Sequence, residues 1–411
     1  MLVALALVGC NARVETPSPA SSTPSPQVSV APTAAPTSTT VPTVTPAPTP
    51  VSAWVAGAPL HQGRQDHTAT LLKDGRLLVA GGTQYVISPE GEDQNQDLSS
   101  VEILTYYPDS AFRYKWEAAP PMPDARSGHD AILLQDGRVL VFGGSTFDAV
   151  VGYAPVTTAA VFDPQRNRWK AIAGPPIATP TGGLLLPDGR VLTVGLTSKG
   201  TPRGQSVAIF DPTTLSWSRG PNHPGGAYRP AMTLLVDGSV LVAGGWYPTA
   251  ELPSPVVDSW RYVVTSDRWE RTTDILEPAF GGPPVRLADG SVLLVSEQTS
   301  NVFDPVASRW TMAAAPLRYL MFPNVVGLSD GRVLVTGQAA CGIDGDATEI
   351  YDPVTDRWQL VEVVPERSDA TLTVLSDGQV ALVGGVLECN VPGEPFVALR
   401  DFDILNPAKI R

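Results

Sequence analysis

The sequence contains few cysteines, histidines and basic residues, and each shortage excludes a class of site or partner. Only three cysteines and four histidines occur among 411 residues, and their spacing matches no zinc site. Lysine and arginine total 28 against 41 aspartates and glutamates, a formal net charge of −13. Because no basic stripe exists to neutralise phosphates, we expect no nucleic-acid partner. No serine–histidine–acid arrangement, phosphate loop or paired-carboxylate motif stands out, so no catalytic residue, metal or cofactor is predicted.

Long apolar runs are scarce as well. Outside the first ten residues, no segment has the length that a helix needs to cross a bilayer. The chain is instead rich in turn formers, with 37 glycines and 41 prolines, and 43% of its residues are apolar, which is enough for a core. This composition favours an all-β fold with many turns.

One stretch recurs along the chain. His67 to Gly82, HTATLLKDGRLLVAGG, is the first of seven variants, and its central Asp-Gly returns after 62, 52, 49, 52, 41 and 47 residues. Such a period is typical of repeat architectures. Asp-Gly predicts a two-residue type I′ hairpin turn, in which both residues have positive φ, and the apolar run after it predicts a strand buried on both faces. The turns contain Asp74, Asp136, Asp188, Asp237, Asp289, Asp330 and Asp377.

A second pattern follows four of the hairpins. Two apolar residues, Asp-Pro, and a tryptophan six residues after the aspartate recur, as in Val161-Phe162-Asp163-Pro164 with Trp169. Asp-Pro starts a turn, and the flanking apolar residues predict a third and a fourth strand. Each unit is therefore expected to be a four-stranded antiparallel blade that cannot bury both faces alone. Blades must stack, and closing them into a ring removes the exposed ends.

The hairpin, the double glycine after it and the spaced tryptophan resemble kelch repeats, which build β-propellers. The LLxDGxVLVxGG pattern is similar to bacterial kelch proteins and to the propeller domain of galactose oxidase. This resemblance covers about residue 53 to the C-terminus and implies a seven-bladed β-propeller of four-stranded kelch-like blades. It stops before the galactose oxidase copper site, which needs two tyrosines, two histidines and a cysteine cross-linked to one tyrosine, because no Tyr-His dipeptide occurs. Propellers host unrelated activities, so the resemblance predicts fold rather than function.

The two ends of the chain are expected to complete one blade together. Six units carry a fourth-strand tryptophan, but the last unit reaches Arg411 without one. Trp54 supplies the missing residue, so we predict that an N-terminal strand closes the ring and that residues 53–411 form one monomeric domain. The six tryptophans are Trp116, Trp169, Trp217, Trp269, Trp310 and Trp358.

Two different segments precede the predicted ring. Residues 1–10 are apolar and end in Leu7-Val8-Gly9-Cys10, which resembles the lipobox of bacterial lipoproteins, where Cys10 would be lipidated after signal cleavage. No Lys or Arg precedes this short stretch, which leaves an ordinary apolar N-terminus, or a start upstream of Met1, as alternatives. Residues 11–52 contain ten prolines and sixteen serines or threonines and predict a disordered stalk. Together they predict an extracytoplasmic protein, anchored by lipid at the bacterial cell surface or periplasmic face.

Candidate ligand-binding arginines precede the first strand of several units. Arg64, Arg126 and Arg367 lie ten residues ahead of the Asp-Gly, and Arg229 and Arg318 fall nearby in their own repeats. Loops at this position reach a mouth of the central channel, where propellers bind ligands. A guanidinium group binds carboxylates or sulfates through two parallel hydrogen bonds, so these residues predict a positive spot for an acidic ligand. The alternative is that they brace neighbouring loops through backbone carbonyls.

Two histidines and a tryptophan complete the predicted ligand site. His67 and His129 follow Arg64 and Arg126 by three residues, and their alternative role is packing at the starts of strands. Trp246 comes directly after Gly244-Gly245, where an exposed ring is a common sugar platform; packing between blades is the alternative.

Three further residues leave alternatives open. Cys341 and Cys389 fall in equivalent loops of neighbouring units, where they form either a disulfide, which an exported protein permits, or two free thiols. Glu297 is either the acid/base residue of a sialate-mutarotase-like reaction or a surface substitution. The sequence favours a binding module for a glycan or surface protein; the alternative is a carbohydrate-active enzyme, sialate-mutarotase-like or oxidase-like, on a kelch propeller.

Overall fold

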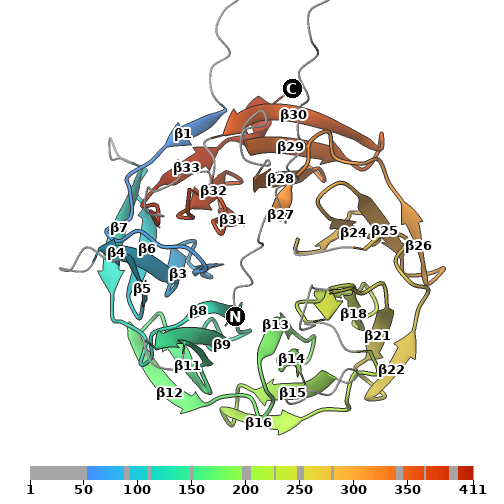
Figure 1. The fold of residues 1–411 in the computed structure, drawn as a ribbon, viewed down its shortest axis with the longest axis horizontal. Coiled ribbons are helices and arrows are strands. Elements are labelled where there is room, and N and C mark those ends of the chain that lie inside the picture. Colours follow the sequence, from blue (N-terminus) through green and yellow to red (C-terminus); the bar gives the residue numbers. More distant parts are fainter. Residues whose placement is uncertain are drawn as a thin grey trace, which may run out of the picture. The chain divides into compact units, whose positions relative to one another are not determined.

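The structure is a computed structural model that describes residues 53–87, 93–108, 113–148, 152–196, 205–225, 228–247, 254–278, 282–338, 346–364, 367–387 and 397–410. Cys10, the stalk at 11–52, Cys341 and Cys389 lie outside these residues, so lipidation, the stalk and the disulfide stay predictions. The unit from Ser52 to Arg411 is a closed ring of seven four-stranded antiparallel sheets (Figure 1). The described residues include no helix with the length and apolar character that a membrane span requires.

Each blade runs from an innermost strand at the channel to an outermost strand at the outer edge of the ring. The blades, each given from the inside outward, are β2 (Thr68–Leu71), β3 (Leu77–Ala80), β6 (Val101–Tyr106), β7 (Tyr114–Ala119); β8 (Ser127–Leu133), β9 (Val139–Asp148), β11 (Thr158–Asp163), β12 (Arg168–Ala173); β13 (Pro180–Leu185), β14 (Val191–Leu196), β15 (Gln205–Asp211), β16 (Ser216–Arg219); β17 (Ala231–Leu234), β18 (Val240–Ala243), β21 (Ser259–Val263), β22 (Arg268–Arg271); β23 (Val285–Arg286), β24 (Val292–Val295), β25 (Ser300–Asp304), β26 (Arg309–Met312); β27 (Met321–Gly327), β28 (Val333–Gln338), β29 (Asp346–Asp352), β30 (Arg357–Val364); and β31 (Thr371–Val374), β32 (Val380–Val383), β33 (Phe402–Leu405), β1 (Trp54–Ala56).

The core lies between neighbouring blades. All residues of β3, β18, β24 and β32 are buried, which confirms that the apolar runs form strands covered on both faces. One core cluster joins Leu78 of blade 1 to Val139 and Phe162 of blade 2. The indole of Trp169 donates to the carbonyl of Pro120 (2.8 Å), in the segment that enters its blade. Trp116, Trp269 and Trp358 make the same kind of bond, so in four blades the recurring tryptophan fixes the outer strand to the segment that enters the blade.

The Asp-Gly hairpins correct the turn predicted from the sequence. The amide of Leu72 donates to the carbonyl of Arg76 (2.8 Å), and the amide of Gly75 donates to the carbonyl of Leu72 (3.0 Å). Three residues, not two, lie between the paired positions, and of these only Gly75 has positive φ, at 85°. The turn is a type I turn followed by a left-handed glycine. Asp74 instead accepts the amide hydrogen of Arg76 (3.2 Å), so its carboxylate, not its φ, fits it to the turn.

The predicted ring closure is confirmed. Strand β1 pairs antiparallel with β33, with Trp54 opposite Leu405, and forms the outer strand of blade 7 (Figure 1). Trp54 is buried, and its indole donates to the hydroxyl of Thr348 in blade 6 (3.0 Å). The N-terminal strand therefore completes blade 7 and also connects it to blade 6.

Candidate functional site at the axial mouth

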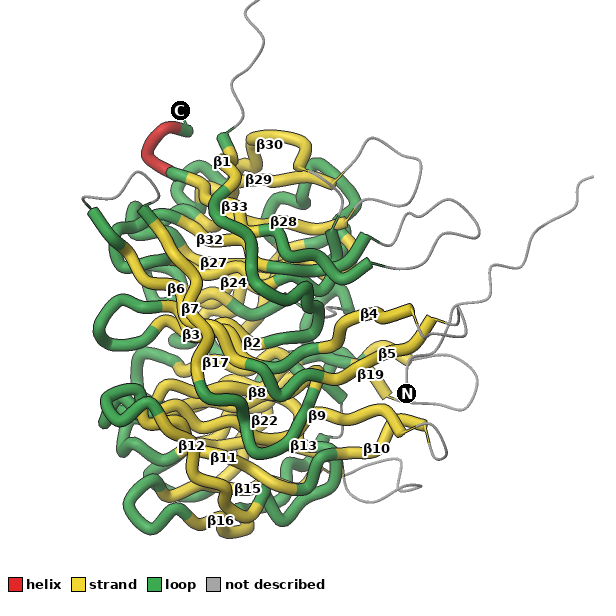
Figure 2. The backbone as a smooth tube through the Cα atoms, turned by 90° about the vertical axis from the view of Figure 1, so that its left-hand side faces the viewer, coloured by secondary structure: helices red, strands yellow, loops and turns green. Residues whose placement is uncertain are grey.

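The ring has two different faces. On one, the hairpins β4 (Thr83–Ile87) with β5 (Asp93–Asp97), β9 with β10 (Gly152–Pro155), and β19 (Trp246–Tyr247) with β20 (Ser254–Pro255) extend beyond the blades (Figure 2, right). We call this the loop face. The opposite side carries the Asp-Gly and Asp-Pro turns, and we call it the turn face. The arginines predicted to bind a ligand precede innermost strands and therefore belong to the loop face.

The innermost strands are entered through residues in the left-handed region. Asp66, Arg229 and Asp369 have φ of 51°, 50° and 52°, and Gly128 takes the same repeat position with φ of 58°. Aspartate and glycine adopt this region more readily than arginine. The amide of Asp66 donates to the carbonyl of Asp369 (3.3 Å), and that of Gly128 donates to the carbonyl of Asp66 (2.9 Å). These bonds form a rim across blades 7, 1 and 2.

Acidic side chains gather at this rim. Burial raises the pKa of Asp66, Arg229 acts to lower it, and the charge of Asp97 raises it further. Burial also raises the pKa of Tyr85 on the β4–β5 hairpin, and the charges of Asp66 and Asp369 act in the same direction. Asp66 therefore lies near both Arg229 and Asp97, and Tyr85 lies near Asp66 and Asp369.

A fourth aspartate stands beside them on blade 2. Burial raises the pKa of Asp130 to about 6, although Arg229 and the amides of Gly182 and Gly183 act to lower it. Its carboxylate accepts the amide hydrogen of Gly182 at 3.1 Å. Asp130 therefore connects the mouth to blade 3 and loses its charge below about pH 6.

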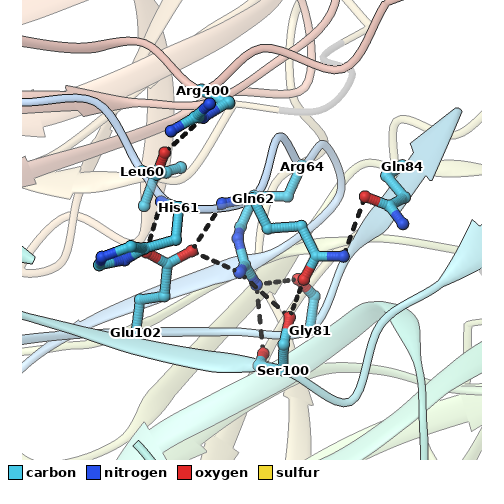
Figure 3. Close-up of polar contacts among 9 residues, drawn as sticks. All are labelled: Leu60, His61, Gln62, Arg64, Gly81, Gln84, Ser100, Glu102 and Arg400. Atoms are coloured by element: carbon cyan, nitrogen blue, oxygen red, sulfur yellow. Dashed lines mark hydrogen bonds and ion pairs between the residues drawn. The ribbon is translucent and has the colours of Figure 1, made fainter. Parts of the chain in front are cut away.

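Arg64 is fully buried beside the inner strands of blade 1 (Figure 3). Its Nη1 donates to the carbonyl of Gly81 (2.8 Å), and its Nη2 donates to Oε1 of Glu102 (2.9 Å). Burial lowers the pKa of Arg64, and the Glu102 carboxylate acts to raise it. Oε2 of Glu102 accepts the amide hydrogen of His61 (2.8 Å). These are the bracing contacts that the sequence left as an alternative.

Arg126 and Arg367 also form hydrogen bonds or ion pairs within the protein. Arg126 is fully buried, donates to the carbonyls of Gly143 and Thr158 (both 3.2 Å), and lies 3.6 Å from a carboxylate oxygen of Asp124. Nη2 of Arg367 lies 2.5 Å from Oδ2 of Asp403. Each of the three arginines that share this repeat position is thus paired with a carboxylate of its own. Contact with a ligand remains a prediction for them.

The two arginines outside that register behave differently. Arg229 has an exposed side chain at the mouth, with its Cζ 5.9 Å from the centroid of the Tyr228 ring. Arg318 is half-buried, and its amide donates to the buried carboxylate of Glu349 (2.8 Å). Glu297, the acid/base candidate, accepts a hydrogen bond from the hydroxyl of Tyr319, the residue after Arg318. Arg229 is therefore the arginine of the predicted set that is most accessible to a ligand.

The paired histidines connect blades. Nε2 of His129 lies 3.0 Å from the hydroxyl of Thr68, and Nε2 of His67 lies 3.0 Å from that of Thr371. Both rings are buried. Burial, with the charge of Arg126, lowers the pKa of His129 to about 3 and, with that of Arg64, lowers the pKa of His67 well below its usual value. These contacts are those of the packing alternative, and in the described part of the chain no group of three or more His, Cys, Asp or Glu residues is arranged to hold a metal ion.

Two aromatic pairs accompany the projecting hairpins. Trp246 is half-buried, and its ring meets that of Tyr228 at 4.8 Å and 71°. The rings of Phe147 and Tyr153, on the β9–β10 hairpin, meet at 5.3 Å, and Phe147 is 41% exposed. Each pair combines packing with a partly accessible ring, so both roles considered for Trp246 are compatible with its position.

Comparisons with known proteins agree with the repeat pattern. No protein-family model matches the chain. Kelch-like protein 40 of Mus musculus is 28% identical over 221 residues, which cover 51% of this chain and 32% of that protein. A putative F-box/kelch-repeat protein of Arabidopsis thaliana is 20% identical over 264 residues, 62% of this chain and 73% of that protein. The chain is a kelch-repeat β-propeller.

The relatives of this kelch propeller are matched only in part. The chain spans 32% of the length of Kelch-like protein 40 and 26% of that of Kelch-like protein 36, also from Mus musculus, to which it is 26% identical over 174 residues. Two solved structures share the fold: a fungal alcohol oxidase of the AA5 family in complex with copper (TM-score 0.62, 14% identity, 86% of this chain and 75% of that one) and YjhT (TM-score 0.53, 12% identity, 74% and 99%). At these identities, the likeness concerns the fold alone.

Sequence reasoning missed the carboxylates of this kelch propeller. Glu102, Glu349 and Asp403 occupy the same position of the third strand and are buried or nearly so. Asp66 and Asp369 follow Arg64 and Arg367 by two residues. A charged residue inside an apolar strand, and an aspartate that repeats in register with an arginine, were the signals that could have found them.

Proposed function

We propose that this kelch propeller is a binding module that holds a positively charged segment of a partner protein at the axial mouth of the loop face. The carrying observation is a group of four aspartates: Asp66 and Asp130 lie within electrostatic reach of the exposed Arg229, Asp97 acts on Asp66, and Asp369 acts on Tyr85. Kelch-repeat propellers are scaffolds of the protein-binding kind.

The charge at the mouth favours a cationic ligand over the acidic ligand that the arginines alone predicted. Arg64 and Arg367 lie against carboxylates at 2.9 and 2.5 Å, whereas the aspartates at the rim outnumber Arg229. Complementary charge speeds the encounter of partners and rejects ligands of like charge. The net charge of −13 acts in the same direction over a longer range.

The hairpins of blades 1 and 2 support one another beside the mouth. The side-chain amide of Asn95 on β5 donates to the hydroxyl of Tyr153 on β10 (3.1 Å). Asp97 accepts the hydroxyl hydrogen of Thr83 (2.8 Å) and also the amide hydrogen of Phe147. A wall held in this way is preorganised, so a bound segment loses less of its affinity to ordering of the protein.

The test compares two labelled peptides of equal length, one rich in lysine and one rich in glutamate, by fluorescence anisotropy with the full chain. We expect the lysine peptide to bind and the glutamate peptide not to. Changing Asp66, Asp130 and Asp369 to asparagine should weaken binding at least tenfold, and asparagine suits the left-handed backbone of Asp66 and Asp369.

A matched control separates the mouth from net charge. Asp211, Asp304 and Asp352 lie in Asp-Pro turns on the turn face, and their change to asparagine removes the same charge. This control should bind the lysine peptide as the wild type does. Equal weakening in both triple variants would mean that only overall charge is sensed, and the proposed site would be wrong. Binding should also fall as pH drops below about 6, where Asp130 becomes neutral.

We further propose that the module is extracytoplasmic and anchored through lipid at Cys10. The support is the apolar segment that ends in Cys10 and the proline-, serine- and threonine-rich residues 11–52. The test is incorporation of a labelled fatty acid into the chain expressed in a bacterium. Label that is lost in Cys10→Ser supports the anchor, and equal label in both chains contradicts it.

A glycan is the second candidate ligand. It is favoured by the Trp246–Tyr228 ring pair beside the mouth, because aromatic faces pack against the C–H groups of sugars. An array of neutral, acidic and sulfated glycans, probed with wild type and Trp246→Ala, tests it. Binding that Trp246→Ala removes would support a glycan ligand, and silence on the array would leave the protein partner.

A further inference from the structure

A cavity of about 780 Å³ opens on the turn face, on the side of the ring opposite to the axial mouth described above. It lies beside blades 4, 5 and 6, and its volume falls in the range typical of small-molecule sites. The lining combines apolar and charged side chains, among them Val236, Val285, Arg286, Leu287, Asp289 and Ser329. All of them are described residues.

The cavity exists because a packing contact of the ring is interrupted. The residue before Asp-Gly normally lies over the glycine of the next turn: a Cβ on Gly290 would meet Val236 at 3.0 Å, and one on Gly189 would meet Gln135 at 2.9 Å. In blade 5 this residue is Ala288, which is too short, and a Cβ on Gly331 in blade 6 would meet nothing within 4 Å. The turn face is therefore open between blades 5 and 6.

Arg286 breaks the repeat at the same place. It stands three residues before Asp-Gly, in strand β23, where blades 1 to 4 have leucine and blade 7 has valine. In blade 6 the corresponding residue is Gly327, and Val285 packs closely against it, since an added Cβ would lie 3.1 Å from a methyl group of Val285. In blades 1 to 4 and 7 the side chain at this position is apolar and half-buried, and this arginine gives up that apolar contact. The equivalent residues are Leu71, Leu133, Leu185, Leu234 and Val374.

The guanidinium of Arg286 is not committed to a neighbour. Its side chain is exposed, and it has no ion-pair partner among the described residues. Arg332, the other cation of the lining, is held by Asp330 (2.7 Å) and by the carbonyl of Pro407 (3.1 Å). The backbone amide and the hydroxyl of Ser291 both donate to the same carboxylate oxygen of Asp289.

We propose that this cavity is a second binding site, for a small organic monocarboxylate held by Arg286. The planar guanidinium offers two parallel hydrogen bonds to a carboxylate, and Val236, Val285 and Leu287 offer apolar surface to the body of the ligand. Asp289 and Asp330 in the same lining repel a second negative charge, so a dicarboxylate binds less well. This site is independent of the peptide site proposed for the loop face.

The test uses cyclohexanecarboxylate and cyclohexylmethanol, which share a ring and differ in charge, titrated into the full chain and followed by NMR. We expect the carboxylate to bind at least tenfold more tightly than the alcohol, and salt to weaken it. Arg286→Leu should lower carboxylate affinity at least tenfold without lowering the melting temperature, because leucine is the residue that four other blades carry.

The matched control is Arg168→Leu, which removes an exposed arginine from the outer strand of blade 2. It should bind the carboxylate as the wild type does. The proposal is overturned if the wild type does not prefer the carboxylate, if Arg286→Leu binds it unchanged, or if both variants lose affinity equally. Failure of the lysine peptide to bind would contradict only the proposal for the loop face.

Discussion

At the scale of single residues, the buried carboxylates of the third strands organise the loop face. Glu102 receives one hydrogen bond from Arg64 and others from the segment that enters its blade, through His61 and Gln62. Asp403 takes the corresponding place against Arg367. One side chain thus fixes an arginine and a loop at the same time, which is why the loop face has a defined shape.

Removing one partner of this pair is expected to be severe. Glu102→Ala leaves the guanidinium of Arg64 buried without a carboxylate and should lower the free energy of unfolding by about 3–5 kcal/mol. Urea titration measures it. The control Glu117→Ala removes an exposed glutamate paired with Lys115 and should change stability by at most about 1 kcal/mol. Similar losses in both variants would contradict the role given to Glu102.

The buried histidines should make stability depend on pH. Burial lowers the pKa of His129 to about 3, below its value of about 6.5 in an unfolded chain. Its contribution to stability is therefore fully present above about pH 6.5 and is lost as pH falls toward 3, by up to about 2 kcal/mol at pH 5. Melting temperatures of wild type and His129→Gln at about pH 7 and pH 5 test this. The variant should lose less on acidification, and parallel losses would refute the assignment.

At the scale of elements, the sequence predicted strands better than turns and sites. The repeat period, the apolar runs and the spacing from Asp-Pro to tryptophan all depend on how the strands pair. They therefore predicted the four-stranded blades and the closing strand that contains Trp54. The turn at Asp74 was mistyped because Asp-Gly occurs both in two-residue type I′ turns and in three-residue turns in which only the glycine has positive φ. The acidic rim was missed because its charge comes from Asp66, Asp130 and Asp369, which lie on three blades and meet only when the ring closes.

The left-handed glycines allow a test of this turn geometry. Gly331 has φ of 89° with open space around it, so Gly331→Ala adds only backbone strain and should cost about 1–2 kcal/mol. At Gly81 the added Cβ would lie 2.6 Å from the carbonyl oxygen of Arg126, so Gly81→Ala should cost distinctly more. Urea titration of both variants decides it, and an unchanged Gly331→Ala would show that the turn does not require its glycine.

At the scale of the whole molecule, closure by β1 determines whether the ring is cooperative. Deleting residues 1–56 removes β1, including the indole of Trp54 that donates to Thr348. Blades 6 and 7 lose one of their shared contacts, and burial of an aromatic side chain of this kind is worth about 3–5 kcal/mol. We expect a sharply lower melting temperature by calorimetry. Deleting residues 1–51 instead keeps β1 and should leave the melt nearly unchanged; equal melts for the two deletions would refute closure by β1.

The pairing of Trp54 with Leu405 also determines when the ring can close during synthesis on the ribosome. The outer strand of the last blade is made first, and its neighbour is made last. At synthesis rates of about 5–20 residues per second, β1 waits roughly 20–70 seconds for β33. During that interval six blades can form, but the seam between the first and the last stays open, with one row of strand edges unpaired. The chain is therefore most exposed to misassembly in the interval just before its final residues emerge, when a chaperone or a strand of a neighbouring chain could pair with β1 in the place of β33.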